Sequence, residues 1–140
     1  MKMWIEMSRD EEHGGSEWGF TKCIWAPTYA DGEKSKTWPF WENVNKVKAG
    51  DTVFHLRGKG REAYFVGFSI ARSDGHKTSE RPQNLGKWAY CKSFYRAFLS
   101  DYVSFSKAIN LYQLFEDKEI DLKRYYRQKG KPRNIFYTIQ

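Results

Sequence analysis

The sequence contains few of the residues that small proteins use for covalent or metal cross-links. Its 140 residues include two cysteines, Cys23 and Cys91, and neither has a second Cys or a His at a spacing typical of zinc sites. A chain of this length can bury a sufficient core without such links. We therefore expect a single domain over 1–140, with both cysteines reduced and packed in the interior, in a cytoplasmic protein.

Long apolar runs are also missing. No stretch of about 18 apolar residues occurs, and the charge of Glu6 comes too early for a secretory signal peptide. We therefore expect a soluble protein that is not exported and has no membrane partner.

Acidic residues are outnumbered, and aromatic residues are abundant. The chain has 24 Lys and Arg against 17 Asp and Glu, a formal net charge of +7, and 18% Phe, Trp and Tyr. Basic side chains attract phosphates and flat rings stack on bases, so the two excesses together favour a nucleic-acid partner. A positive charge also serves solubility alone, so composition leaves both interpretations open.

Hydrophobic periodicity and turn residues predict an α+β domain. The alternation over 2–7 is typical of a half-buried first strand. The other expected elements are strands over 20–27, 52–56, 63–71, 87–98 and 135–139, helices over 38–46, 106–115 and 116–128, and a long polar loop over 72–87. The region 101–133 is thus expected to be a helical addition before the last strand. Gly67 is expected to mark a bulge or a close backbone approach.

Trp25 stands near the end of the strand that stops at Pro27. That position places a large ring at the rim of the sheet, where it can line a binding pocket. Burial in the core is the alternative for a tryptophan in a strand.

Three short motifs occur in an order that resembles the PUA-like superfamily, especially its EVE and YTH branches. They are Ile24-Trp25-Ala26-Pro27, the segment 47–53 (Val-Lys-Ala-Gly-Asp-Thr-Val) and the segment 65–69 (Phe-Val-Gly-Phe-Ser). The resemblance covers residues 1 to about 100. It implies a small curved PUA-like β-barrel flanked by helices, whose pocket receives a single flipped, often methylated, base between aromatic side chains.

The resemblance also implies which residues form the base-binding cage. Trp25 stands where the YTH branch has one cage tryptophan, and Trp88 is the nearest match to the second. Trp38 and Trp41 are alternatives for closing the cage.

The first loop departs from the YTH pattern, because Ser8, Arg9 and Asp10 replace an asparagine-rich run. We expect these three residues to contact the base edge. An ionised Asp10 can only accept hydrogen bonds, which suits the exocyclic amino group of cytosine, so we expect a modified cytosine.

Basic residues in the loops are expected to hold phosphates around the pocket without reading the sequence. They are Lys34, Lys36, Arg57, Lys59, Arg61, Arg81 and Lys87.

The opening segment 4–15 and the segments 67–69 and 78–82 are similar to sensor domains of bacterial modification-dependent restriction nucleases. The similarity implies a reader of modified double-stranded DNA whose effector is a nuclease domain or subunit. Extruding a base costs a few kcal/mol and each stacking contact returns ~1–3 kcal/mol, so two rings are needed. No cofactor is expected.

Other functions remain open at this point. RNA is an alternative ligand, since YTH-like relatives read N6-methyladenine in RNA. A protein-interaction module using Tyr125 and Tyr126 is another. Catalysis is not expected, because the polar residues 10–13 are adjacent on one loop and no histidine has a Ser or Cys partner marked by the sequence.

Overall fold

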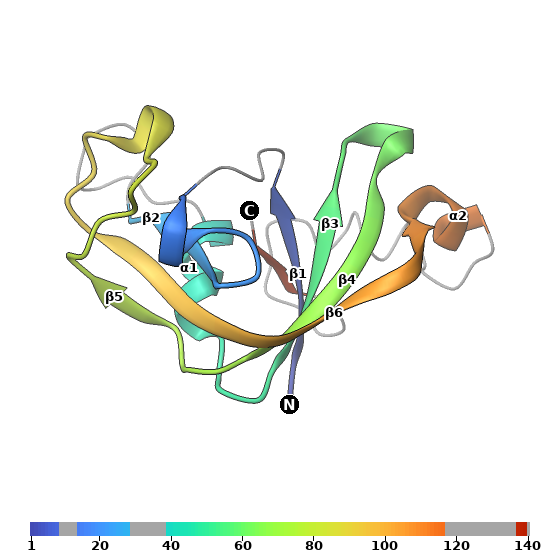
Figure 1. The fold of residues 1–140 in the computed structure, drawn as a ribbon, viewed down its shortest axis with the longest axis horizontal. Coiled ribbons are helices and arrows are strands. Elements are labelled where there is room, and N and C mark those ends of the chain that lie inside the picture. The colour runs from blue at the N-terminus through green and yellow to red at the C-terminus, as the bar shows by residue number, and fades with distance from the viewer. Residues whose placement is uncertain (9–13, 29–38, 117–136, 140) are drawn as a thin grey trace.

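The computed structural model describes residues 1–8, 14–28, 39–116 and 137–139. These residues form a seven-stranded sheet in the order β2-β6-β4-β3-β1-β7, with β5 paired to β6. The sheet curls into a half-barrel, as Figure 1 shows, which agrees with the expected small curved sheet flanked by helices. The strands are β1 (Met3–Ser8), β2 (Cys23–Pro27), β3 (Thr52–Arg57), β4 (Tyr64–Ala71), β5 (His76–Thr78), β6 (Phe94–Asn110) and β7 (Tyr137–Ile139).

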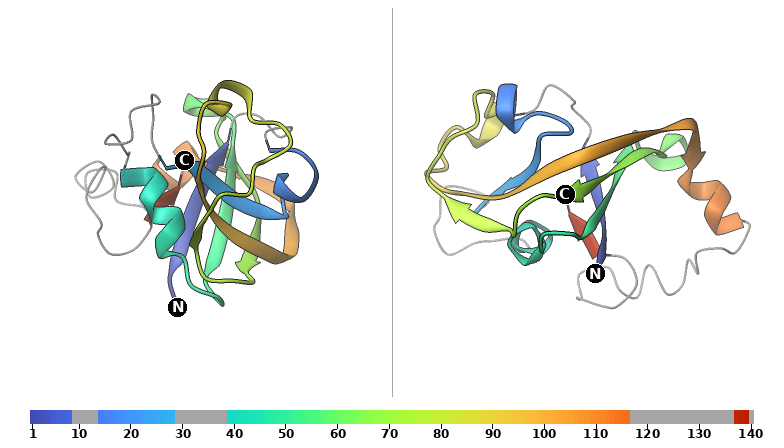
Figure 2. Two further views of the ribbon diagram at one scale, coloured as in Figure 1. Left: turned by 90° about the vertical axis from the view of Figure 1, so that its left-hand side faces the viewer. Right: turned by 60° about the horizontal axis from the view of Figure 1, so that its bottom comes forward.

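Two α-helices lie at different ends of the described sheet. The helices are α1 (Pro39–Lys46) and α2 (Leu111–Glu116), with 3-10 turns η1 (Ser16–Trp18), η2 (Gly60–Glu62) and η3 (Gly86–Trp88). Figure 2 shows α1 beside the sheet and α2 beyond the end of β6. Val44 of α1 and Val47, which directly follows the helix, are both fully buried, and the sequence predicts them on one face. Within the described residues, no helix combines the length and apolarity needed to cross a membrane.

The first strand is buried on both faces, so its prediction as a half-buried strand is wrong. β1 lies inside the sheet, parallel to β3 on one side and to β7 on the other. Its neighbouring residues Trp4 and Ile5 point to opposite faces and are 0% and 2% exposed. Successive side chains of a strand point to opposite faces of the sheet. Where both faces are buried, apolar residues occupy odd and even positions alike, so apolar and polar residues do not alternate along the sequence.

Asp51 joins the starts of β1 and β3. Its carboxylate accepts hydrogen bonds from the backbone N–H of Lys2, the indole N–H of Trp4 and the backbone N–H of Lys48, each at 2.9 Å. Burial alone would raise the pKa of Asp51, but these three donors outweigh it and lower the pKa below its ordinary value. The carboxylate is therefore ionised at neutral pH, and it fixes the register between the two parallel strands.

The longest strand, β6, produces the curl. Its first five residues pair with β2 and β5, and the residues from Leu99 onward pair with β4. The pairing with β4 shifts register twice, and Asp101 has a positive φ of 54° at one of these irregularities. Extra residues in one strand increase its twist and bend it.

Gly67 of β4 lies opposite this irregular part of β6. A Cβ at Gly67 would lie 2.3 Å from the carbonyl oxygen of Val103 and 2.8 Å from the ring of Tyr102. The predicted close backbone approach at this glycine is therefore confirmed.

Three predictions on the second half of the chain are wrong in part, although 94–98 is strand and 111–115 is helix as expected. The segment 106–110, expected to be helical, is the end of β6, because it pairs with the apolar start of β4. The helix begins only at Leu111, where the side chain of Asn110 accepts a 3.0 Å hydrogen bond from the N–H of Gln113. The segment 87–93, expected to be strand, contains part of η3, and the expected loop 72–87 contains β5. The expected helix over 116–128 lies outside the described residues apart from Glu116.

Candidate functional site

Aromatic side chains of β2, η1 and β6 meet at the β2 end of the sheet. Trp25, half-buried on β2, contacts Trp18 edge to face at 6.0 Å and Phe94 at 5.6 Å between ring centroids. Trp18 and Phe94 are themselves buried, together with both cysteines. Trp25 is therefore neither a pure core residue nor a free surface ring, as its position before Pro27 predicts.

Trp88 and Trp41 complete this aromatic region, which we call the tryptophan cluster (Trp18, Trp25, Trp41 and Trp88). Trp88 on η3 packs against the same buried residues as Trp25. Its ring also contacts Trp41 of α1 at 5.0 Å with an interplanar angle of 83°. Rings that meet edge to face form a corner, so a base would lie against this pair and not between its members.

Arg96 connects the tryptophan cluster to the sheet. It lies on β6 between Trp25 of β2 and His76 of β5. Its guanidinium lies 3.8 Å from the ring centroid of Trp18, and Nη2 donates a 2.9 Å hydrogen bond to the carbonyl oxygen of Glu17. With 4% exposure, Arg96 is a buried cation that holds η1 against the strand.

Sequence reasoning missed Trp18 and Arg96. Trp18 stands in a short polar stretch without periodicity, where no local signal indicates burial. Arg96 stands among apolar residues of the predicted strand. An arginine is uncommon in such a position, so it was a possible sign of a special role.

The predicted base-edge residues are outside the described structure, except for the backbone of Ser8. Ser8 ends β1 and pairs with Arg57 of β3. Arg9 and Asp10 lie outside the described residues, as do Trp38, Lys34 and Lys36.

The remaining predicted phosphate-binding residues form two groups. The turn between β3 and β4 carries Arg57, Lys59 and Arg61, while Arg81 and Lys87 lie near η3, toward the opposite end of the molecule in Figure 1. Lys59 and Arg61 are exposed, and Lys87 is placed by its backbone alone.

Two of these arginines already bind protein groups. Arg57 pairs with Glu6 at 2.8 Å and is 12% exposed. Arg81 donates hydrogen bonds to the carbonyl oxygens of Cys91 and Ala89. Of the described basic residues in the predicted set, Lys59 and Arg61 thus remain the best placed for phosphate.

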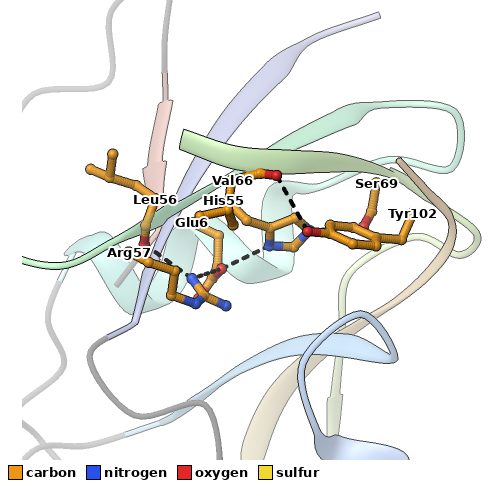
Figure 3. Close-up of polar contacts among 7 residues, drawn as sticks. All are labelled: Glu6, His55, Leu56, Arg57, Val66, Ser69 and Tyr102. Atoms are coloured by element: carbon orange, nitrogen blue, oxygen red, sulfur yellow. Dashed lines mark hydrogen bonds and ion pairs between the residues drawn. The ribbon is translucent and has the colours of Figure 1, made fainter. Parts of the chain in front are cut away.

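A polar network lies among β1, β3, β4 and β6 (Figure 3). The carboxylate of Glu6 receives 2.9 Å and 2.8 Å contacts from Nδ1 of His55 and Nη1 of Arg57. On the other side of the imidazole, Nε2 lies 2.7 Å from Oγ of Ser69. An ionised carboxylate can only accept, so Nδ1 of His55 donates to Glu6.

The pKa of Glu6 is consistent with this ionised state. Burial alone would raise it, but the hydrogen bond from His55 and the positive charge of Arg57 outweigh the burial and lower it below its ordinary value.

The sequence marks no serine partner for a histidine, but in the structure His55 of β3 has one, Ser69. The partner was detectable in principle, since His55 and Ser69 lie on the two strands of the predicted hairpin. The order Ser69–His55–Glu6 has the connectivity of a hydrolytic triad. However, Ser69 is 0% exposed in the middle of a central strand, so its hydroxyl is closed to a substrate. In this conformation the network is structural.

Both cysteines are free and buried, as predicted. Burial raises the pKa of the Cys23 thiol to about 11, although Arg96 opposes the shift. Cys23 is therefore a thiol at neutral pH and a poor nucleophile. Across the described part of the chain, no three His, Cys, Asp or Glu side chains gather as metal ligands would. The acidic segment 10–13 lies outside it.

Comparisons with known proteins give no assignment. Neither a protein-family model nor a curated protein matches this chain.

Proposed function

We propose that this protein reads nucleic acid by holding one extruded, modified base against the tryptophan cluster. The observation that carries the proposal is that Trp25 of β2 and Trp88 of η3 pack on one buried aromatic core, and that Trp41 of α1, which packs on the main core, meets the ring of Trp88. Sequence-distant tryptophans at one end of a sheet provide several faces and edges for a flat ligand. The formal charge of +7 adds attraction to a polyanion.

The energies favour a cluster over a single ring. Base extrusion costs a few kcal/mol, and each base–aromatic stack is worth ~1–3 kcal/mol. A methylated base adds apolar area to the same contact. A base that stacks on one tryptophan and meets the edge of a second therefore comes closer to offsetting extrusion than a base on a single ring, and a modification can tip the balance.

We further propose that the half-barrel is a PUA-like fold of the EVE/YTH type. The order of the motifs and the curled sheet support this proposal. Modified cytosine in double-stranded DNA is the proposed ligand, and a nuclease domain or subunit of a modification-dependent restriction system is the proposed effector. The resemblance of the segments 4–15 and 78–82 to such sensors supports these finer assignments.

The test is a comparison of matched 5-methylcytosine and cytosine duplexes against wild type, Trp25→Ala and Trp88→Ala. The proposal expects tighter binding of the modified duplex by wild type and loss of that preference in both variants. Tyr64→Ala, which truncates an exposed ring outside the tryptophan cluster, is the matched control and keeps the preference.

Circular dichroism of each variant separates lost recognition from lost structure. Where an alanine variant unfolds, the phenylalanine variant at the same position gives the answer, because a smaller ring weakens stacking but fills part of the space. Equal binding of both duplexes by the wild type contradicts the proposal. Binding confined to RNA that carries N6-methyladenine would show that the tryptophan cluster reads modified RNA and not modified DNA.

A further inference from the structure

Phe20 lies over the polar network in a manner that resembles a bound ligand. Its ring contacts His55 edge to face at 5.1 Å and Tyr102 at 5.2 Å, and the guanidinium of Arg57 lies 4.5 Å from its centroid. We call the three residues around the ring, His55, Arg57 and Tyr102, the ring box. A flat side chain with a cation on it and two rings at its sides has the surroundings of a stacked base.

The ring box adjoins polar groups with which a phenyl ring cannot form hydrogen bonds. Glu6 is ionised and 13% exposed, and it lies against Arg57 and His55. Nε of Arg57 is buried and has no hydrogen-bond partner among the described residues. A buried N–H without a partner is costly, and the hydrocarbon ring of Phe20 cannot satisfy it.

The segment that carries Phe20 is strained. Thr21 has a positive φ of 71°, which is unfavourable for a β-branched residue, and Ser16 has a positive φ of 51°. Phe20 itself is only half-buried. The contacts of Phe20 in the ring box act on this strained segment together with the backbone hydrogen bonds that hold it, such as the one from the N–H of Lys22 to the carbonyl oxygen of Gly19.

We propose that the ring box is a binding site for a nucleobase, and that Phe20 occupies it until a base displaces the ring. The entering base would stack on Arg57 between His55 and Tyr102. An amino or ring N–H on the edge of the base would donate to the carboxylate of Glu6. Every nucleobase offers an N–H donor on its Watson–Crick edge. The site uses none of the tryptophans and requires no modification, so it is independent of the reader function proposed above.

The experiment measures binding of 2-aminopurine riboside, a fluorescent base with an amino donor and ring-nitrogen acceptors, to the whole chain. Phe20→Ala empties the ring box, so this variant is expected to bind the probe about tenfold more tightly than wild type or better. If Phe20 only packs against its neighbours, Phe20→Ala will bind the probe no more tightly than wild type. Phe105→Ala is the matched control, because Phe105 packs against a different group of core residues.

A second substitution identifies the site of the gain. Arg57→Lys keeps the charge but removes the planar guanidinium and its Nε–H, so in the Phe20→Ala background it is expected to abolish the gain. The proposal is overturned if Phe20→Ala binds no better than wild type, if Phe105→Ala gains equally, or if the gain survives Arg57→Lys.

One further variant completes the design. Where circular dichroism shows that Phe20→Ala is unfolded, Phe20→Leu replaces it. Leucine fills part of the space but lacks the flat face that stacks on Arg57, so a smaller gain in probe affinity is expected. The gain is measured as the difference between Phe20→Ala and wild type, so probe binding at the tryptophan cluster is common to both proteins and cancels. Failure of the ring box and failure of the tryptophan cluster are therefore seen in separate measurements.

Discussion

The guanidinium of Arg96 lies 3.8 Å from the ring centroid of Trp18, and Trp18 in turn meets Trp25 edge to face at 6.0 Å. A buried cation on β6 thus supports Trp25 through one intermediate ring. The same guanidinium lies 4.2 Å from the ring centroid of Phe98. The position of Trp25 therefore depends on a residue that itself lies beneath the surface.

Replacing Arg96 should be costly, although its ion pair is weak. Arg96→Met removes two desolvated cation–π contacts and the hydrogen bond to Glu17, and it should lower the free energy of unfolding by about 2–4 kcal/mol. Urea denaturation measures this loss.

The partner variant Glu80→Ala separates packing from charge pairing. Glu80 is 74% exposed and lies 3.3 Å from Arg96, so its loss should cost less than about 1 kcal/mol. Equal losses in the two variants would show that the ion pair, and not the aromatic contact, dominates.

Glu6→Gln should lower stability in a pH-dependent way. The folded state holds the pKa of Glu6 below its ordinary value of 4.5, so its contribution is present above that value and is lost as the pH falls through the folded pKa. The variant leaves Arg57 and His55 without their carboxylate, and at pH 6 it should cost about 3 kcal/mol. Urea denaturation at pH 6 and again near pH 3 should show the difference from wild type shrinking in acid. A difference that stays constant with pH would contradict the ionic origin of the effect.

Asp51→Asn should also destabilise the fold, by about 2 kcal/mol, because an amide cannot accept from three N–H donors as the carboxylate does. Asp74→Asn is the matched control. Asp74 is exposed and accepts one backbone hydrogen bond, from Ala49, so its replacement should cost less than about 1 kcal/mol. The free energies of unfolding at pH 7 decide the comparison, and a loss at Asp74 as large as that at Asp51 would refute the account.

Gly67→Ala should force β4 and β6 apart. The new methyl group would lie 2.3 Å from the carbonyl oxygen of Val103, and backbone atoms on both sides must move. Overpacking of this kind costs about 1–3 kcal/mol, which thermal unfolding followed by circular dichroism will detect. The exposed cross-strand neighbour Ser104 serves as the control, since Ser104→Ala adds no atoms. An unchanged Tm for Gly67→Ala would show that the strands have room at this point.

Elements with strong local signals were predictable from the sequence. The hairpin of β3 and β4 and the helix α1 follow from turn residues and apolar periodicity. The role of Gly67 followed because a glycine inside an apolar strand usually marks a close approach. These features depend on residues near one another in the chain.

Features set by distant pairing were not predictable in the same way. The apolar spacing at the end of β6 suits both a helix and a strand, and only pairing with β4 decides between them. The burial of β1 on both faces was not predictable, because its second neighbour, β7, comes from the other end of the chain.

The candidate site was partly predictable. The sequence places Trp25 at the rim of the sheet and groups it with Trp88 and Trp41. In the structure Trp25 and Trp88 pack on one aromatic core, and Trp41 reaches it through its contact with Trp88. The prediction missed Trp18 and Arg96, whose roles arise from contacts between η1 and β6. It also counted Arg57 among the phosphate-binding residues, whereas its guanidinium pairs with Glu6 on the neighbouring strand.

The most direct test of the account is a binding titration at physiological salt with matched duplexes that carry cytosine, 5-methylcytosine, 5-hydroxymethylcytosine, adenine or N6-methyladenine at one position. The account predicts that wild type binds a modified-cytosine duplex more tightly than the others, and that Trp25→Ala removes the preference while the protein stays folded. Equal affinity of the wild type for all duplexes, or a preference that survives in folded Trp25→Ala, would contradict it.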